Sequence, residues 1–165
     1  MLNKKMEEML SEQVQFEVFS SYLYLSMSAF CHSINLKGFG HWMRQQSHEE
    51  HHHAMKLFDY MIERGNWVSL SSVEKPSHRF KSVHDVMEKS LEHEQKVTVQ
   101  IHKLYELAGQ QKDYATQIML QWFVNEQVEE EATVKAIIDK LKLIPEKSSA
   151  ILYLDKELGK RAPTA

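Results

Sequence analysis

The sequence predicts an all-α fold: a four-helix bundle with one long crossover between the second and third helices and a short fifth helix at the C-terminus. Three observations support this prediction. The 165 residues include only five Gly and three Pro, which cut the chain into long uninterrupted segments. Each long segment repeats apolar residues every three or four positions, the spacing of a helix that buries one face. The middle link between segments is far longer than the other two. Residues 1–165 are therefore expected to form one domain.

The first helix is predicted between Leu2 and Ser33, a segment that contains neither Gly nor Pro. From Val14 to Phe30 it is apolar on nearly every side. A helix that is apolar all round must be covered all round, and a four-helix bundle leaves one face of each helix outside. We therefore predict a homo-oligomer in which another subunit covers this helix.

Three further helices follow from the positions of glycine and proline. The second begins near Gly38 and ends at Gly65-Asn66, the third spans 80–108, and the fourth spans 110–144 and stops at Pro145. At roughly 25 to 29 residues, each helix is about 40 Å long. We expect these seam residues to line the core: Phe39, Met43, Gln46, Glu50, His53, Leu57 and Tyr60; Met87, Ser90, Glu94, Val97, Ile101, Leu104 and Ala108; Leu120, Phe123, Gln127, Glu130, Val134, Ile137 and Leu141.

The lengths of the links predict the topology. The first and third links are short, which makes each helix pair an antiparallel hairpin. The middle link, Gly65 to Ser82, has about 18 residues and can extend to roughly 60 Å, longer than the bundle, so it is expected to cross the whole bundle. A short terminal helix is expected from Ser148, as its N-cap, to Leu158, with Gly159 ending it.

Composition excludes several classes of function. The formal charge is −3, with 20 basic and 23 acidic residues, which argues against a nucleic-acid partner bound by phosphate neutralisation. The single cysteine, Cys31, rules out an internal disulfide or a Cys-x-x-Cys metal knuckle. The first ten residues show no signal peptide, and the most apolar stretch contains Gln15 and Glu17, so no membrane association is expected. The expected location is cytoplasmic.

Polar residues occupy seam positions where core residues belong. They are Glu17, Glu50, His53, Glu94, Gln127 and Glu130. Glu50 follows Glu17 at the same interval at which Gln127 follows Glu94. One constant shift in numbering carries Glu17, Glu50 and His53 onto Glu94, Gln127 and Glu130, and also carries Glu49 onto Glu126. The chain therefore resembles two tandem hairpins, whose polar residues meet at the same depth in one bundle.

Four carboxylates in an apolar core would be strongly destabilising unless they were neutralised. Two divalent cations would balance four negative charges. Carboxylate and imidazole ligands spaced at i, i+3 inside a bundle match the di-iron or di-manganese carboxylate pattern. The sequence therefore predicts a two-metal centre.

The chain resembles the bacterial non-haem ferritins of the ferritin-like di-iron superfamily. The similarity covers essentially the whole chain and includes NEQVEEE at 125–131, SHEEHHH at 47–53, LFDY at 57–60 and LDKEL at 154–158. The resemblance implies a hollow homo-oligomeric shell of 24 subunits that stores iron. Such a shell would oxidise Fe(II) with O2 or H2O2 and hold Fe(III) as a mineral.

The resemblance also implies roles for individual residues. Glu17, Glu50 and His53 would bind the first iron, Glu50 would bridge, and Glu94 and Glu130 would bind the second iron with Gln127 close by. Glu49, Glu126 and Glu129 would form a third iron site with Glu130. Tyr24 would be a redox-active tyrosine beside the centre. No haem is expected, because the haem-binding branch has a second Glu-x-x-His at 127–130 and a methionine where this chain has His51.

Other interpretations fit parts of the same pattern. A soluble di-iron carboxylate redox enzyme would carry the same centre but store no mineral. A purely structural bundle would use the polar seam only to fix its register. The pattern His48-Glu49-Glu50-His51-His52 satisfies the zinc-protease motif His-Glu-x-x-His, although it places the histidines on another helix face from Glu50 and His53. Trp122 is expected to pack in the core. The uncharged Gln127 suggests that the second iron is held less tightly, as in a transit site.

Overall fold

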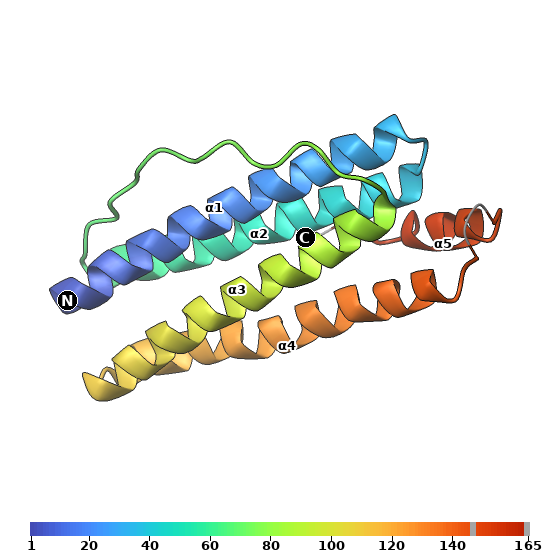
Figure 1. Cartoon of the computed structure of the whole chain (residues 1–165). Helices are drawn as coiled ribbons and strands as arrows, with labels where there is room; N and C mark the ends of the chain where they lie inside the picture. The colour runs from blue at the N-terminus through green and yellow to red at the C-terminus, as the bar shows by residue number, and fades with distance from the viewer. Residues whose placement is uncertain (146–147, 164–165) are drawn as a thin grey trace.

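The computed structural model describes residues 1–145 and 148–163, and these residues contain five α-helices and no strand. The helices are α1 Lys4–Ser33, α2 Lys37–Glu63, α3 Val83–Gln110, α4 Tyr114–Lys142 and α5 Ile151–Leu158. Two antiparallel hairpins, α1–α2 and α3–α4, pack together, and α1 lies against α3 (Figure 1). The predicted four-helix bundle with a short fifth helix is confirmed.

Three helices end in the same turn, in which one residue adopts a left-handed conformation. The positive φ angles are 61° at Asn35, 72° at Gly65 and 56° at Lys112. The N–H of the following residue then bonds to the carbonyl five residues earlier, with N···O distances of 2.9 to 3.1 Å. This pattern satisfies carbonyl groups that a helix end leaves unpaired. The shift in numbering that carries Glu17 onto Glu94 also carries Asn35 onto Lys112, so the tandem similarity of the hairpins extends to their turns.

The middle link crosses the bundle, as its length predicts. It leaves the end of α2 and runs alongside α1 to the start of α3 (Figure 1). Its residues meet α1 in sequence order: Asn66 Oδ1 accepts from the N–H of Leu2 at 2.6 Å, Ser72 O accepts from Gln15 at 2.8 Å, and Ser77 O accepts from Ser26 at 2.7 Å. Phe80 then packs on Phe30, with ring centroids 5.4 Å apart. The link is therefore a strap along α1, and it makes α2 and α3 parallel.

The fifth helix begins later than the sequence predicts. Its first residue is Ile151, and Ser148 starts a preceding turn in which its hydroxyl accepts from the N–H of Ala150 at 3.2 Å. The predicted N-cap at Ser148 is thus wrong by two residues, because that serine begins a tight turn that precedes the helix. Gly159 ends the helix as expected. The helix lies against α2, where Asp155 Oδ1 accepts from the N–H of Phe39 at 2.9 Å.

The apolar core is divided into two clusters. One includes Met27, Phe39 and Met43 and extends to α5, and the other includes Leu10, Leu57 and Leu104 near the opposite end. All the predicted seam positions are buried except Tyr60, which is partly buried. The polar seam residues lie between the two clusters in the chain register, and they form a polar layer across the middle of the bundle.

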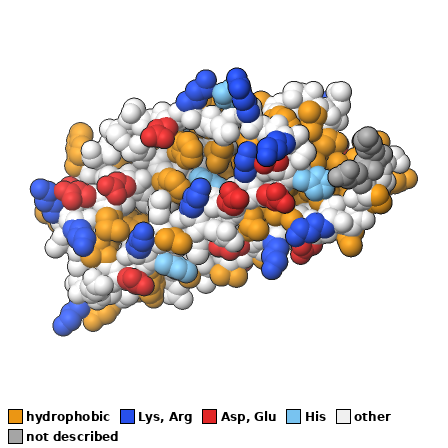
Figure 2. Space-filling view, viewed as in Figure 1, with side chains coloured by type: hydrophobic (Ala, Val, Ile, Leu, Met, Phe, Trp, Pro, Cys, Tyr) orange, Lys and Arg blue, Asp and Glu red, His pale blue; other side chains and the backbone are white. Residues whose placement is uncertain are grey.

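The outer face mixes apolar side chains with charges of both signs (Figure 2). Neighbouring elements of the same chain cover much of the apolar surface of α1. Tyr22 and Leu25 nevertheless remain 50% and 47% exposed. Within the described residues, no helix has the length and apolar character needed to cross a membrane.

Candidate metal centre

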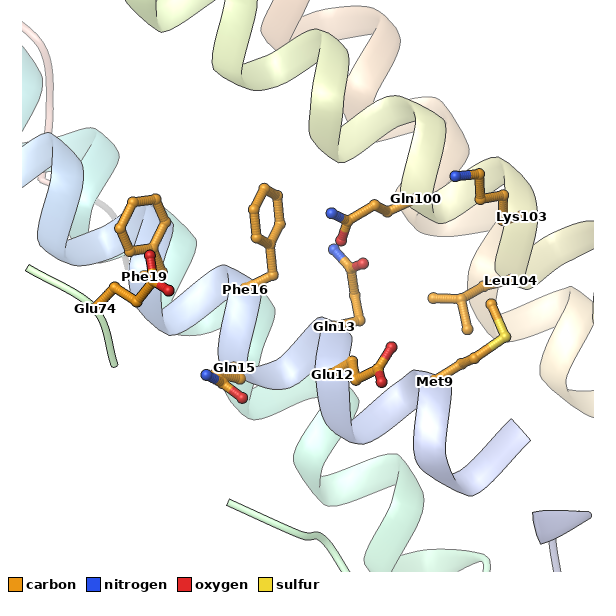
Figure 3. A pocket seen from close by; sticks show the side chains of 10 residues that line it. All are labelled: Met9, Glu12, Gln13, Gln15, Phe16, Phe19, Glu74, Gln100, Lys103 and Leu104. Carbon is orange, nitrogen blue, oxygen red and sulfur yellow. The ribbon is translucent and has the colours of Figure 1, made fainter. Parts of the chain in front are cut away.

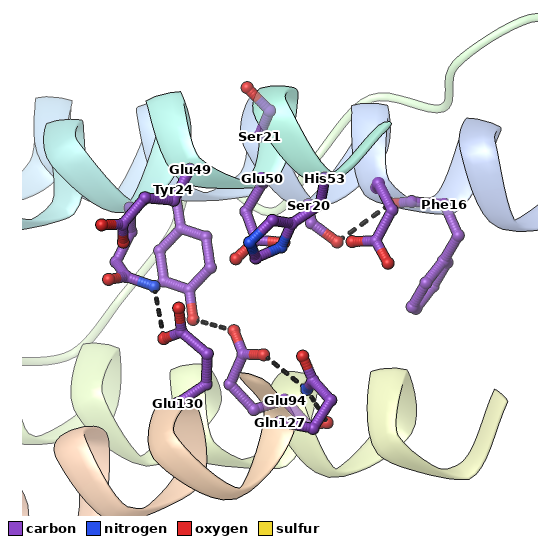
Figure 4. Close-up of polar contacts among 12 residues, drawn as sticks. Phe16, Ser20, Ser21, Tyr24, Glu49, Glu50, His53, Glu94, Gln127 and Glu130 are labelled. Atoms are coloured by element: carbon purple, nitrogen blue, oxygen red, sulfur yellow. Dashed lines mark hydrogen bonds and ion pairs between the residues drawn. The ribbon is translucent and has the colours of Figure 1, made fainter. Parts of the chain in front are cut away.

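The four long helices bring six polar side chains into one layer. Glu17 comes from α1. Figure 4 shows the other five: Glu50 and His53 from α2, Glu94 from α3, and Gln127 and Glu130 from α4. None of these residues is more than 6% exposed. The spacings of three residues in α2 and α4 place both members of each pair on one helix face. The structure thus gathers the residues that the sequence singled out as metal ligands.

Two groups of side chains offer atoms that could hold a metal ion. Ligand atoms of Glu17, Glu50 and His53 all lie within 4.8 Å of one another, and so do those of His53, Glu126 and Glu130. His53 belongs to both groups. The family resemblance gave His53 only to the first iron, whereas the geometry also places it beside the residues of the second hairpin.

Glu94 is held by donors from two other helices. The hydroxyl of Tyr24 donates to Glu94 Oε1, and Gln127 Nε2 donates to Glu94 Oε2 at 3.1 Å (Figure 4). The same amide lies 3.2 Å from the Glu94 main-chain carbonyl. Tyr24 is fully buried, so its hydroxyl lies inside the layer rather than at its edge.

Two further amides hold carboxylates in this layer, and the sequence pattern alone assigned neither of them a role. Gln13 Nε2 donates to Glu17 Oε1 at 2.7 Å, and Gln46 Nε2 donates to Glu130 Oε2 at 2.8 Å. Both glutamines are nearly fully buried. For Gln13 the sequence holds a signal, since it lies four residues before Glu17 on the same helix; for Gln46 it holds none, because its partner Glu130 lies on another helix.

Burial and mutual repulsion favour the neutral forms of these carboxyl groups. Desolvation, the larger cause, raises the pKa of Glu17 to about 7 and that of Glu130 to about 8, and neighbouring carboxylates such as Glu94 add to both shifts. The pKa of Glu50 is raised well above its usual value, and that of Glu94 is also raised, mainly by burial. Burial lowers the pKa of His53 to about 4, so its imidazole is neutral near pH 7. The layer therefore combines proton-carrying carboxyl groups with a free imidazole lone pair.

Three buried oxygens of the layer have no hydrogen-bond partner among the described residues: Glu17 Oε2, Glu50 Oε1 and Gln46 Oε1. Leaving a buried acceptor unpaired costs about 1–3 kcal/mol. A divalent cation would use such oxygens and displace the protons on the carboxyl groups. The donor set of hard oxygens with one imidazole suits ferrous iron.

The residues expected at a third site are only partly gathered. Glu126 is grouped with His53 and Glu130, and burial followed by the charges of Glu129 and Glu49 raises the pKa of Glu126. Glu129 is exposed. The carboxylate of Glu49 forms an ion pair with Arg161, a residue that the sequence pattern did not single out.

The zinc-protease pattern and the expected core position of Trp122 are not supported. His48, His51 and His52 are exposed, and none belongs to a group of three metal-binding side chains among the described residues. Trp122 is 37% exposed, not buried. It packs edge-on to His53 at 5.4 Å, and the Lys56 ammonium lies 4.2 Å from its ring centroid.

A surface pocket of about 490 Å³ lies between α1, α3 and the strap (Figure 3). Its lining includes Gln13 and Phe16 from α1, Leu104 from α3 and Glu74 from the strap. None of the gathered carboxylates lines this pocket. Gln13 links the two places, because it lines the pocket and its amide bonds to Glu17.

Known proteins that resemble this chain include several ferritins. A ferritin-like domain family matches residues 7–144. A bacterial non-heme ferritin of Campylobacter jejuni is 42% identical over 156 residues, covering 94% of this chain and 93% of that protein. A bacterial non-heme ferritin of Escherichia coli O157:H7 is 39% identical over 159 residues and 96% of each chain.

Solved structures similar to this chain are also ferritins. An engineered closed form of the Archaeoglobus fulgidus ferritin superposes with a TM-score of 0.97 at 50% identity, covering 99% of this chain and 100% of that one. The open pore ferritin from the same archaeon gives a TM-score of 0.96 at 50% identity, covering 98% of each chain. The chain described here belongs to the ferritin family.

Proposed function

We propose that this chain is an iron-storage ferritin with ferroxidase activity at the buried polar layer. Fe(II) is the substrate, O2 or H2O2 is the oxidant, and Fe(III) is stored as a mineral inside a hollow shell of 24 copies. The observation that carries the proposal is the set of four buried carboxyl groups and one neutral imidazole in a chain of the ferritin family.

The ligands divide between two ferrous ions. Glu17, Glu50 and His53 bind the first ion, and Glu50 bridges to the second, which Glu94 and Glu130 bind. Four carboxylates then balance two divalent cations, which offsets the burial and the mutual repulsion that raise the pKa values of Glu50 and Glu130. Gln127 lies beside the second ion and adds no charge. No haem takes part.

The protein prepares the layer for oxidation. Each Fe(II) loses one electron to the oxidant, which comes from solution, and the redox chemistry belongs to iron. The carboxyl groups release their protons as the ions bind. The buried amides of Gln13 and Gln46 orient Glu17 and Glu130, while Tyr24 orients Glu94 from the opposite hairpin. In this proposal Tyr24 also acts as a redox-active group.

Replacing Tyr24 with phenylalanine is expected to lower the initial rate of Fe(II) oxidation roughly tenfold, as loss of a ligand-orienting hydrogen bond does at other metal sites. The ring still fills its buried position, but Glu94 loses a donor. Stopped-flow absorbance after mixing with Fe(II) and O2 measures the rate. The half-exposed Tyr22 on the same helix gives the matched control, Tyr22→Phe. Equal rates in the two variants would remove Tyr24 from the mechanism.

Replacing Gln127 with glutamate tests whether the second position is a transit site. The variant adds a fifth carboxylate beside Glu94, and this extra charge is expected to hold the second ion at least about tenfold more tightly. Iron retained per chain after long dialysis against a chelator is the measurement. The parent protein is expected to lose iron and Gln127→Glu to keep more of it. Retention of two ions per chain by the parent would contradict the transit role.

A third iron site is proposed beside the centre, formed by Glu49, Glu126, Glu129 and Glu130. Its support is the placement of Glu126 with Glu130 and His53, and the charges of Glu129 and Glu49, which add to burial in raising the pKa of Glu126. This site would take ions leaving or approaching the two-iron centre.

The shell and the cellular location are further parts of the proposal. Tyr22 and Leu25 leave an apolar area on the outside of α1, which another subunit would cover. Twenty-four such copies form the shell expected for this family. A cytoplasmic location fits a protein whose substrate is ferrous iron.

Size-exclusion chromatography with iron detection tests the function directly. Several hundred ferrous ions per expected shell are added in air before the run. Co-elution of the iron with a particle of about 24 subunits supports storage. A small oligomer with about two irons per chain would instead identify a soluble di-iron redox enzyme, the second candidate, which the same ligand layer would serve.

A further inference from the structure

The chain after α5 returns to the metal centre and places Arg161 beside it. The guanidinium of Arg161 forms an ion pair with Glu49, lies over the Trp42 ring at 4.7 Å, and reaches the Trp42 carbonyl at 3.5 Å. The Arg161 carbonyl lies 2.9 Å from His41 Nε2. Asp155 fixes the preceding helix to α2 through the N–H of Phe39. Arg161 is therefore held by several contacts and is only 21% exposed.

The charge of Arg161 acts on the acidic side chains that face Glu49. It lowers the pKa of Glu130, against the larger raising effects of burial and of the charges of Glu94 and Glu49. Glu49 in turn raises the pKa of Glu126. Lys56, which lies over Trp122, is the cation that lowers the pKa of Glu126. Arg161 thus neutralises the Glu49 side of the acidic cluster.

We propose that Arg161 is a built-in cation that occupies the place of the third metal ion at Glu49. A guanidinium and a metal ion compete for the same carboxylate oxygens, so the third site opens only when Arg161 withdraws. The inference rests on the proposed function, because it concerns ions handled by the ferroxidase centre. It is supported by the neighbouring group of His53, Glu126 and Glu130, whose ligand atoms lie within 4.8 Å of one another. The charge of Glu49 adds to burial in raising the pKa of both Glu126 and Glu130.

Competition has a reciprocal consequence. If Arg161 weakens the binding of a third ion, that ion must weaken the attachment of the C-terminal segment by the same factor. Filling the third site is therefore expected to release residues 159–163 from α2. Iron loading would thus change the conformation of residues 159–163, a segment that lies far along the sequence from every ligand.

The test uses Zn²⁺, a redox-inert probe, and the intact assembled protein. Isothermal titration of the parent, Arg161→Gln and Lys160→Gln gives the number of ions bound per chain and their affinities. Lys160 is exposed and adjacent, so its variant removes the same charge without touching Glu49. Arg161→Gln is expected to bind a third ion roughly five- to tenfold more tightly than either the parent or Lys160→Gln. Arg161→Lys, which keeps the charge, is expected to restore most of the parent behaviour.

A second set of variants separates competition from a structural effect. In a Glu49→Gln background the carboxylate that Arg161 shares is gone, so Arg161→Gln should no longer change the affinity of the third ion. Hydrogen exchange at the main-chain amides of residues 159–162 should rise on addition of Zn²⁺ in the parent protein. An unchanged third affinity in Arg161→Gln, or the same gain in the Glu49→Gln background, would overturn the proposal.

These outcomes are distinguishable from failure of the proposed function. If the parent binds fewer than two ions per chain, the two-iron centre itself is wrong. If it binds two ions tightly but Arg161→Gln gains nothing, the centre stands and only the role of Arg161 is rejected.

Discussion

Glu17→Gln is expected to lower the initial rate of Fe(II) oxidation by at least about a hundredfold. This loss is larger than the loss expected when a residue that only supports a metal ligand is removed. Glutamine keeps the shape of the side chain and can still accept from Gln13, so the bundle should fold and assemble as before. It removes one of the four negative charges that balance two ferrous ions. Stopped-flow absorbance measures the rate, and size-exclusion chromatography checks assembly.

The control for this experiment is Glu12→Gln, on the same helix. Glu12 is exposed and lies in the lining of the pocket between α1 and α3, not among the gathered carboxylates. The Glu12→Gln variant should oxidise iron at the parent rate. An initial rate in Glu17→Gln that matched the control would show that oxidation takes place elsewhere in the molecule.

The metal-free protein is expected to become less stable as the pH rises from 6.5 to 8. Glu17, with a pKa of about 7, and Glu130, with a pKa of about 8, both have folded values above the usual 4.5. Their stabilising contribution is complete below about 4.5 and is lost as the pH rises through the folded values. Burial lowers the pKa values of His53 and His93 from 6.5 to about 4. The stability that the protein gains as these histidines lose their protons is therefore complete by about pH 6.5. The midpoint of thermal unfolding should fall by about 5 °C or more.

Bound metal is expected to reverse this trend. Zn²⁺ takes the place of the protons on the carboxyl groups, so its stabilising effect should increase over the same pH range. Glu130→Gln, which removes one titrating group, should flatten the fall in the metal-free protein. Circular dichroism melts at half-unit pH steps give the comparison. A metal-free protein whose melting temperature rises with pH would contradict the raised carboxyl pKa values.

The depth of the ligand layer could be predicted from sequence because helix geometry is regular. Equal separations across two short turns place Glu17 opposite Glu50 and Glu94 opposite Gln127 at the same height. The absence of charged residues elsewhere in the seams then leaves one possible level for a metal centre. The long middle link predicted the crossover because, when extended, it is longer than the bundle and can run from one end to the other.

Other features depended on side-chain direction or on long-range contacts, which the periodic pattern does not encode. The amides of Gln13 and Gln46 could have faced any of several neighbours, and only packing decides that they bond to Glu17 and Glu130. Arg161 reaches Glu49 across 112 residues of sequence, after a helix whose docking on α2 had no signature. Trp122 was expected in the core because tryptophan is large and apolar, yet its position beside His53 leaves it partly exposed.

The division of the core has a consequence for how such proteins evolve. Each apolar cluster fills its own half of the bundle, and neither cluster includes the carboxylates that lie between them. Substitutions in the layer can therefore change metal preference, or abolish metal binding, without forcing the hydrophobic halves to repack. Lineages can exchange one chemistry for another, or retire it, while inheriting the same scaffold.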